Sequence, residues 1–351
     1  MLAWLPLLVL SALEGNAWGP RVQVPFLFDL DVHTRFLLAL PLFIAAELVV
    51  HQRMRVMVSQ FVDRGLVPSG ELEKFKAAIS SAFRLRNSVL AEVLLVAIVY
   101  GVGVLFIWRS YAALDVANWS GTTVTGQMHP TLAGWWYGLL SLPLIQFLLL
   151  RWYYRLFIWS RFLFQVSRLK LELVPTHPDG AGGLGFLGGV GQTFALLMIA
   201  QGALLAGVLA NRIFIHGARL TDFKLEIIGW VALILCFVLG PLCLLLPTLA
   251  DCKRVGLREY GALAQRYVRE FDQKWLRGGA PSDEPLLGSA DIQSLNDLSA
   301  SYQNVREMKL VPVSRDALIQ VVLIALLPIS PLVLTMIPFS ELLERLLAVV
   351  F

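Results

Sequence analysis

The chain has 351 residues, of which 57% are hydrophobic and only 15% charged, and its mean hydropathy is +0.68. These values exclude an ordinary soluble globular protein and favour a chain whose main solvent is lipid. Its apolar runs are continuous, which excludes a membrane β-barrel with its alternating pattern. Backbone in lipid must form its hydrogen bonds internally, so we predict an all-α polytopic integral membrane protein.

Six apolar runs approach the roughly 20 residues that a helix needs to cross the hydrocarbon core of a bilayer. They are Phe36–Val50, Val89–Trp108, Leu132–Leu150, Thr193–Ile213, Ile227–Leu249 and Ala317–Phe339. The chain thus divides into an N-terminal segment (1–33), a five-helix membrane region (34–250), a helical hairpin (251–316) and a sixth membrane helix with a tail (317–351). Within the first segment, Met1–Leu13 is too short to span. It is an interfacial helix or, alternatively, part of a signal-like sequence over residues 1–17.

Basic residues gather in three connections between the spans, and this asymmetry predicts the topology. The three connections carry Arg53, Arg55, Arg64, Lys74, Lys76, Arg84 and Arg86; Arg151, Arg155, Arg161, Arg168 and Lys170; and Lys253, Arg254, Arg258, Arg266, Arg269, Lys274, Arg277, Arg306, Lys309 and Arg315. We therefore expect an inner (plasma) membrane protein of bacterial type, with basic connections in the cytoplasm and both termini outside. The net charge of +4 is then explained by attraction to anionic lipid headgroups, and we predict no nucleic-acid partner.

Two of these connections contain predicted cytoplasmic helices. One covers residues 69–88, is capped by Ser69, and continues into the second span as one rod. The other connection forms a hairpin, because two stretches carry apolar residues at helical spacing around a break at residues 277–285. Asp291 is expected to cap its second arm. Each apolar stripe must be buried against the other arm, the 69–88 helix or a neighbouring subunit, and we expect a homo-oligomer.

The segment 176–191 is the richest in glycine, with His177 and Asp179 ahead of the first glycine. Gly185 and Gly189 form G-x-x-x-G, which together with Gly202, Ala206 and Ala210 favours close helix packing. The earlier glycines, Gly180, Gly182 and Gly183, are not needed for packing. A glycine-rich turn at the start of a helix presents backbone N–H groups to an anion, so these three form a hypothetical anion-binding loop.

Several ionisable residues are predicted near one membrane depth beside this loop. Glu47 and His51 share a helix face, Glu92 begins the second span and Asp251 ends the fifth. With His177 and Asp179 they form a hypothetical ligand or ion site. The alternative is that Glu47 and Glu92 only pair with Arg53, Arg55, Arg84 or Arg86. No fixed metal-ligand spacing is present, so no metal or cofactor is assigned.

Prolines interrupt four of the spans, and the sixth, with Pro328, Pro331 and Pro338, is the best candidate for a broken helix. These features favour a channel or transporter-like protein for a small ion or solute. One alternative is a membrane-embedded enzyme acting on a lipid headgroup or phosphate, with His177 as acid or base and Asp179 as base or metal ligand. The other is a membrane scaffold or signalling subunit that binds a partner through the hairpin. Whether the chain is an enzyme stays open.

Overall fold

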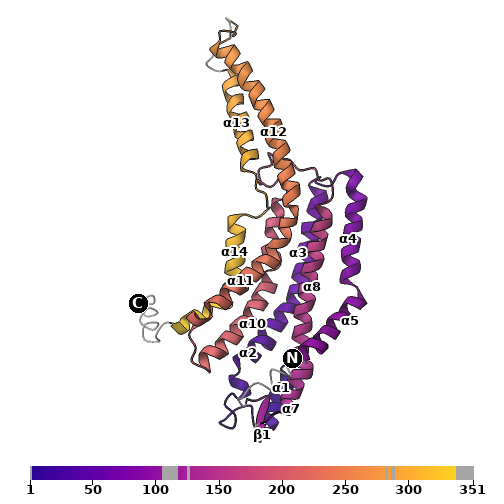
Figure 1. The fold of residues 1–351 in the computed structure, drawn as a ribbon, viewed down its shortest axis with the longest axis vertical. Helices are drawn as coiled ribbons and strands as arrows, with labels where there is room; N and C mark the ends of the chain where they lie inside the picture. Colours follow the sequence, from indigo (N-terminus) through magenta and orange to yellow (C-terminus); the bar gives the residue numbers. More distant parts are fainter. Residues whose placement is uncertain (1, 105–117, 125–126, 282–283, 286–288, 337–351) are drawn as a thin grey trace.

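The computed structural model describes residues 2–104, 118–124, 127–281, 284–285 and 289–336. It is a bundle of long helices from which one helical hairpin extends (Figure 1). We name the end of the bundle that carries α1 and β1 the α1 end, and the end that carries α12 and α13 the hairpin end. The predicted all-α class is confirmed for the described residues with one addition, a short antiparallel strand pair, β1 (Gly121–Val124) and β2 (Gln127–Pro130).

The N-terminal helix α1 (Leu5–Leu13) packs against the bundle. Leu7 and Ser11 are fully buried, and the Ser141 hydroxyl donates a hydrogen bond of 2.8 Å to the carbonyl oxygen of Ala3. The short apolar helix predicted within residues 1–33 is therefore present. Its position at a membrane surface and the signal-like alternative stay predictions.

The first predicted span is part of a much longer helix, Leu30–Asp63. It is made of α2 (Leu30–His33), a π-helical segment η2 (Thr34–Ala39) and α3 (Leu40–Asp63). The helix continues past Val50, the predicted end of the span, because a buried stripe with Met57 and Phe61 runs on along one face of α3. The helix thus extends 13 residues past the predicted end.

The second span does not continue the preceding helix as one rod. The helix Ser69–Arg86, made of η3 (Ser69–Glu71) and α4 (Leu72–Arg86), is bent by 45° from Val89–Gly103, which contains α5 (Val89–Ile98) and the start of η4 (Val99–Val104). Ser88 has an extended backbone, and its hydroxyl accepts the N–H of Ala91, so it caps a new helix. Ser69 makes no such cap. Residues 105–108 of the predicted span lie outside the described residues.

The third span and the aromatic segment after it form one helix, Leu132–Val166, as predicted. It consists of α7 (Leu132–Trp136), a π-helical segment η5 (Tyr137–Ser141) and α8 (Leu142–Val166). The indole Nε1 of Trp152 donates a hydrogen bond of 3.2 Å to the carbonyl oxygen of Phe43, which fixes α8 against α3.

The fourth span, α10 (Ala195–Phe214), is the most buried of the candidate spans. It follows η6 (Gly185–Gly189) and α9 (Val190–Thr193). A Cβ atom at Gly202 would lie 2.9 Å from the carbonyl oxygen of Ala325, and one at Gly207 would lie 3.1 Å from the Cα of Asp31. The predicted close approach of a neighbouring helix is therefore confirmed at Gly202, whereas Gly189 of the predicted G-x-x-x-G has open space around it and Gly185 meets the Asp179 side chain.

The fifth span belongs to a helical run of 57 residues, Leu220–Leu276. It contains η7 (Leu220–Phe223), α11 (Lys224–Leu239), a 3₁₀ segment η8 (Gly240–Leu245) at the predicted proline site, α12 (Leu246–Phe271) and η9 (Asp272–Leu276). α13 (Ala290–Glu307) returns along α12 to complete the predicted hairpin (Figure 1). Ser289, and not Asp291, caps α13; the Asp291 carboxylate instead accepts Lys274 Nζ at 2.8 Å and Trp275 Nε1 at 2.9 Å.

The sixth span is broken, as its prolines predicted. α14 (Arg315–Leu326) and η10 (Ser330–Met336) meet at 64°. Pro338 and the rest of the predicted tail lie outside the described residues. By length and composition, four helices of the described chain can cross a membrane, or up to six if each bent pair counts as one span. The prediction of about six spans agrees with the upper number.

Candidate functional site

A cavity of about 730 Å³ lies between α3, α4 and α8 near the hairpin end. The three helices present residues at helical spacing to it: Val50, Met54, Val58 and Val62 with His51, Arg55, Ser59 and Asp63 from α3; Phe75, Ile79, Ala82, Phe83 and Arg86 from α4; and Arg155, Ile158, Trp159 and Phe162 from α8, together with Phe194. Because most of these side chains are apolar, we name the cavity the apolar groove. In the sequence, this groove is indicated by lining residues of α3 that recur at i, i+4 spacing.

Two side-chain hydrogen bonds hold α4 in place as the outer wall of the groove. Arg161 donates to the hydroxyl of Ser81 at 2.7 Å, and the Tyr154 hydroxyl donates to the carbonyl oxygen of Leu85 at 3.1 Å. α4 therefore lies against α8, and the 45° bend after it carries α5 away in another direction (Figure 1).

The charged lining of the groove is concentrated at one end, where His51, Arg55, Arg86 and Arg155 meet. The Nη1 of Arg86 lies 3.2 Å from the Nδ1 of His51. A guanidinium can only donate, so this Nδ1 accepts and the ring hydrogen is assigned to Nε2. We name these four residues the basic end of the groove.

Glu47 and Glu92 lie next to the basic end, and both pair with arginines of α8. Glu47 bonds to Arg155, and the Nη2 of Arg151 lies 3.6 Å from a carboxylate oxygen of Glu47 and 3.6 Å from one of Glu92. Two carboxylates and two guanidiniums thus compensate one another. The partners expected from the sequence, Arg53, Arg55, Arg84 and Arg86, were wrong, because α8 supplies two arginines one turn apart that face α3 and α5.

In the glycine-rich turn, the backbone N–H groups bind a carboxylate of the same turn. The Asp179 carboxylate accepts backbone N–H groups from Ala181 at 2.8 Å, Gly183 at 3.1 Å and Gly185 at 2.8 Å. Partial burial raises the pKa of Asp179, but these bonds and a contact with His177 outweigh it and lower the pKa below its usual value. The amides expected to cradle an external anion therefore include donors already committed to this side chain.

The conformation of this turn also explains its glycines. Gly180, Gly182 and Gly183 have φ values of +62°, +64° and +98°, which side-chain-bearing residues rarely adopt. The Nδ1 of His177 lies 2.9 Å from the Asp179 carboxylate and 3.2 Å from the amide nitrogen of the same residue. His177 and Asp179 thus contact each other, as parts of a closed turn.

The predicted ligand-site residues lie in separate places. The turn packs at the far end of α3, where the Phe186 and Phe61 ring centroids are 5.1 Å apart; Glu47 precedes Phe61 by 14 residues, which is about 21 Å of helix rise. Asp251 forms an exposed ion pair with Arg254 at 2.7 Å. Within the described ranges, no three His, Cys, Asp or Glu side chains could hold a metal ion. The expectation that these residues lie at one depth was wrong, because α3 continues past Val50 and the turn packs at its far end.

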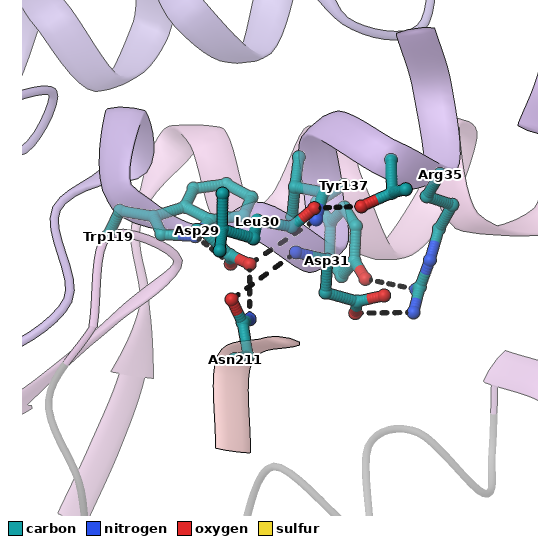
Figure 2. Close-up of polar contacts among 9 residues, drawn as sticks. Asp29, Leu30, Asp31, Arg35, Trp119, Tyr137 and Asn211 are labelled. Atoms are coloured by element: carbon teal, nitrogen blue, oxygen red, sulfur yellow. Dashed lines mark hydrogen bonds and ion pairs between the residues drawn. The ribbon is translucent and has the colours of Figure 1, made fainter. Parts of the chain in front are cut away.

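A polar network at the α1 end was missed by the sequence reasoning (Figure 2). Asp29 accepts Trp119 Nε1 at 2.7 Å and Asn211 Nδ2 at 2.7 Å, while Arg35 pairs with Asp31 at 2.5 Å and donates to the Tyr137 hydroxyl at 2.6 Å. The available signal was the charged sequence Asp29–Arg35 directly before an apolar run. The network joins the start of α2 and the segment η2 to η5 and α10 and is structural in character.

The fold and the apolar groove together define a helical bundle of membrane-spanning proportions with an amphiphilic cavity near its hairpin end. The chain matches no family model, and no curated protein or solved structure is significantly similar to it.

Proposed function

We propose that the chain is an integral membrane protein that binds an anionic lipid in the apolar groove at the cytoplasmic face. The observation that carries the proposal is the division of the groove into an apolar body and a basic end. An amphiphile with an acyl chain and a negative headgroup matches both parts, and a volume near 730 Å³ falls within the roughly 300–1,000 Å³ of small-molecule sites.

The position of the basic end along α3 supports a site at the level of the lipid headgroups. Arg35 and Arg55 are 20 residues apart on one continuous helix, which corresponds to about 30 Å of rise. This equals the thickness of the hydrocarbon core of a typical bilayer. If Arg35 lies at one interface, Arg55 lies at the other, on the side that the basic connections assign to the cytoplasm, and the apolar body with Val58, Val62 and Phe162 continues from there toward the hairpin end.

The charge balance at the basic end favours an anion over a cation. Among the described residues, neither Arg55 nor Arg86 has a carboxylate within ion-pair distance, whereas Arg155 is compensated by Glu47. The channel mouth expected from the sequence needed free carboxylates, and Glu47 and Glu92 are paired with arginine. Lipid binding therefore takes precedence over ion or solute transport as the proposal.

Trp159 provides the test, because it lines the groove and is only 4% exposed. Bromine atoms on a lipid acyl chain quench tryptophan fluorescence at contact distance. We expect brominated phosphatidylglycerol to quench purified protein more than brominated phosphatidylcholine does, and this excess to disappear in Trp159→Phe. The indole Nε1 of Trp159 has no hydrogen-bond partner, so the substitution removes no polar contact.

Trp136 is a matched control at the opposite end of the bundle. Its side chain is 36% exposed on an apolar helix, so Trp136→Phe should reduce quenching by both lipids equally. Equal quenching by the two lipids in the wild type, with no selective change in Trp159→Phe, would overturn the proposal.

A further inference from the structure

The basic end carries an excess of positive charge. Of its three guanidiniums, that of Arg155 is bonded to Glu47, whereas those of Arg55 and Arg86 have no carboxylate within ion-pair distance in the described chain. The Nδ1 of His51 lies 3.2 Å from the Nη1 of Arg86. The charge of Arg86 also acts on Glu47, so Glu47 offsets part of the positive charge that Arg55 and Arg86 bring to this end of the groove.

Two guanidiniums discriminate between classes of phosphate. A phosphomonoester carries a charge of about −1.5 to −2 at pH 7 and has three oxygens free to accept hydrogen bonds. A phosphodiester carries a single charge and has two such oxygens. Two guanidiniums carry a charge of +2, which matches the charge of a phosphomonoester more closely than that of a phosphodiester, and each guanidinium can donate two parallel bonds to phosphate oxygens.

The arginine from α4 is also held in position before any ligand arrives. Arg86 contacts His51 on one side, and its guanidinium carbon lies 5.2 Å from the centroid of the Phe83 ring. Asp63, the carboxylate in the lining, is eight residues beyond Arg55 on α3, which is about 12 Å away along the helix. Repulsion of a dianion at the basic end by this group is therefore small.

From these observations we infer that the groove selects lipids with a phosphomonoester headgroup over lipids with a phosphodiester headgroup. The inference rests on the proposed lipid binding and names the class of lipid. The acyl chain lies along the apolar body, and the terminal phosphate lies between Arg55 and Arg86.

The experiment compares two brominated lipids with identical acyl chains, phosphatidic acid and phosphatidylglycerol, titrated against the full-length protein in neutral detergent at pH 7.5. We expect phosphatidic acid to bind at least about tenfold more tightly, as read from the quenching of Trp159. Arg55→Gln and Arg86→Gln should each remove most of this preference while leaving phosphatidylglycerol binding within a few-fold of the wild type. Arg84→Gln, the same change on an exposed residue of α4 outside the groove, should leave both affinities unchanged.

If the two lipids bind equally tightly and their quenching depends on Trp159, the monoester inference is overturned and the proposed function still stands. Absence of Trp159-dependent quenching by either lipid would overturn both.

Discussion

Replacement of Asp179 by Asn tests whether the glycine-rich turn is held by its own carboxylate. Oδ1 accepts two backbone N–H groups and Oδ2 accepts a third, whereas an Asn side chain has one acceptor oxygen. In the better orientation Asn keeps the bonds from Ala181 and Gly183, and its NH₂ group faces the N–H of Gly185. A hydrogen bond to a charged group contributes about 1.5–3 kcal/mol, and the Gly185 donor would remain unpaired.

We therefore expect Asp179→Asn to lower the free energy of unfolding by about 2–4 kcal/mol. For a chain of this size roughly 2 °C corresponds to 1 kcal/mol, so the thermal midpoint in detergent should fall by about 4–8 °C. Asp251→Asn is the control, because its ion pair with Arg254 is exposed, and such pairs contribute at most about 1 kcal/mol. Intrinsic fluorescence during heating measures both variants.

The same variant predicts a pH dependence. The pKa of Asp179 is lowered in the folded chain, so its carboxylate stabilises the fold fully above the unfolded value of about 3.9, and this contribution is lost as the pH falls further. The wild-type and Asp179→Asn midpoints should thus converge as the pH falls below about 4. If Asp179→Asn matches Asp251→Asn at pH 7, the turn does not depend on the carboxylate and the reasoning fails.

Two further changes test helix packing at other places. Gly202→Ala brings a Cβ within 2.9 Å of the carbonyl oxygen of Ala325. The cost of overpacking, about 1–3 kcal/mol, should outweigh the gain of about 1 kcal/mol in helix propensity, so the thermal midpoint should fall. Gly229→Ala is the control, because the space around Gly229 is open and the midpoint should rise. Asn211→Ala removes the amide that bonds to Asp29 at 2.7 Å and should cost about 1–3 kcal/mol, measured as a lower midpoint in the same assay; an unchanged midpoint would show that the network of Figure 2 does not join α2 to α10.

The apolar runs predicted the existence of the membrane-length helices, because burial in lipid requires long continuous apolar segments whatever the tertiary fold. They did not predict the end of α3, since beyond Val50 the helix is polar on one face and buried on the other, which lowers the average hydropathy. The bend before α5 had a local signal that was not used: Ser88 directly precedes an apolar run and is a good N-cap residue.

The candidate site was harder to predict, because its contacts join residues far apart in the sequence. Glu47 bonds to Arg155, which is 108 residues away in the sequence, and no local sequence feature distinguishes that arginine from Arg53 or Arg55. His177 and Asp179 were correctly placed in a glycine-rich turn. Of the three glycines expected to bind an external anion, Gly183 donates its N–H to the Asp179 side chain and Gly180 donates to the carbonyl oxygen of His177.

The run from α11 through α12 has a mechanical consequence. Gly256 is the last buried residue of α12, and beyond it the run continues to Leu276 as an arm about 30 Å long at 1.5 Å per residue. A change of about 10° at the base of this arm would displace its tip by roughly 5 Å, as with any rigid lever of that length. Small rearrangements among the packed helices are thereby converted into larger movements far from the bundle, where a soluble reporter attached near Leu276 could record them.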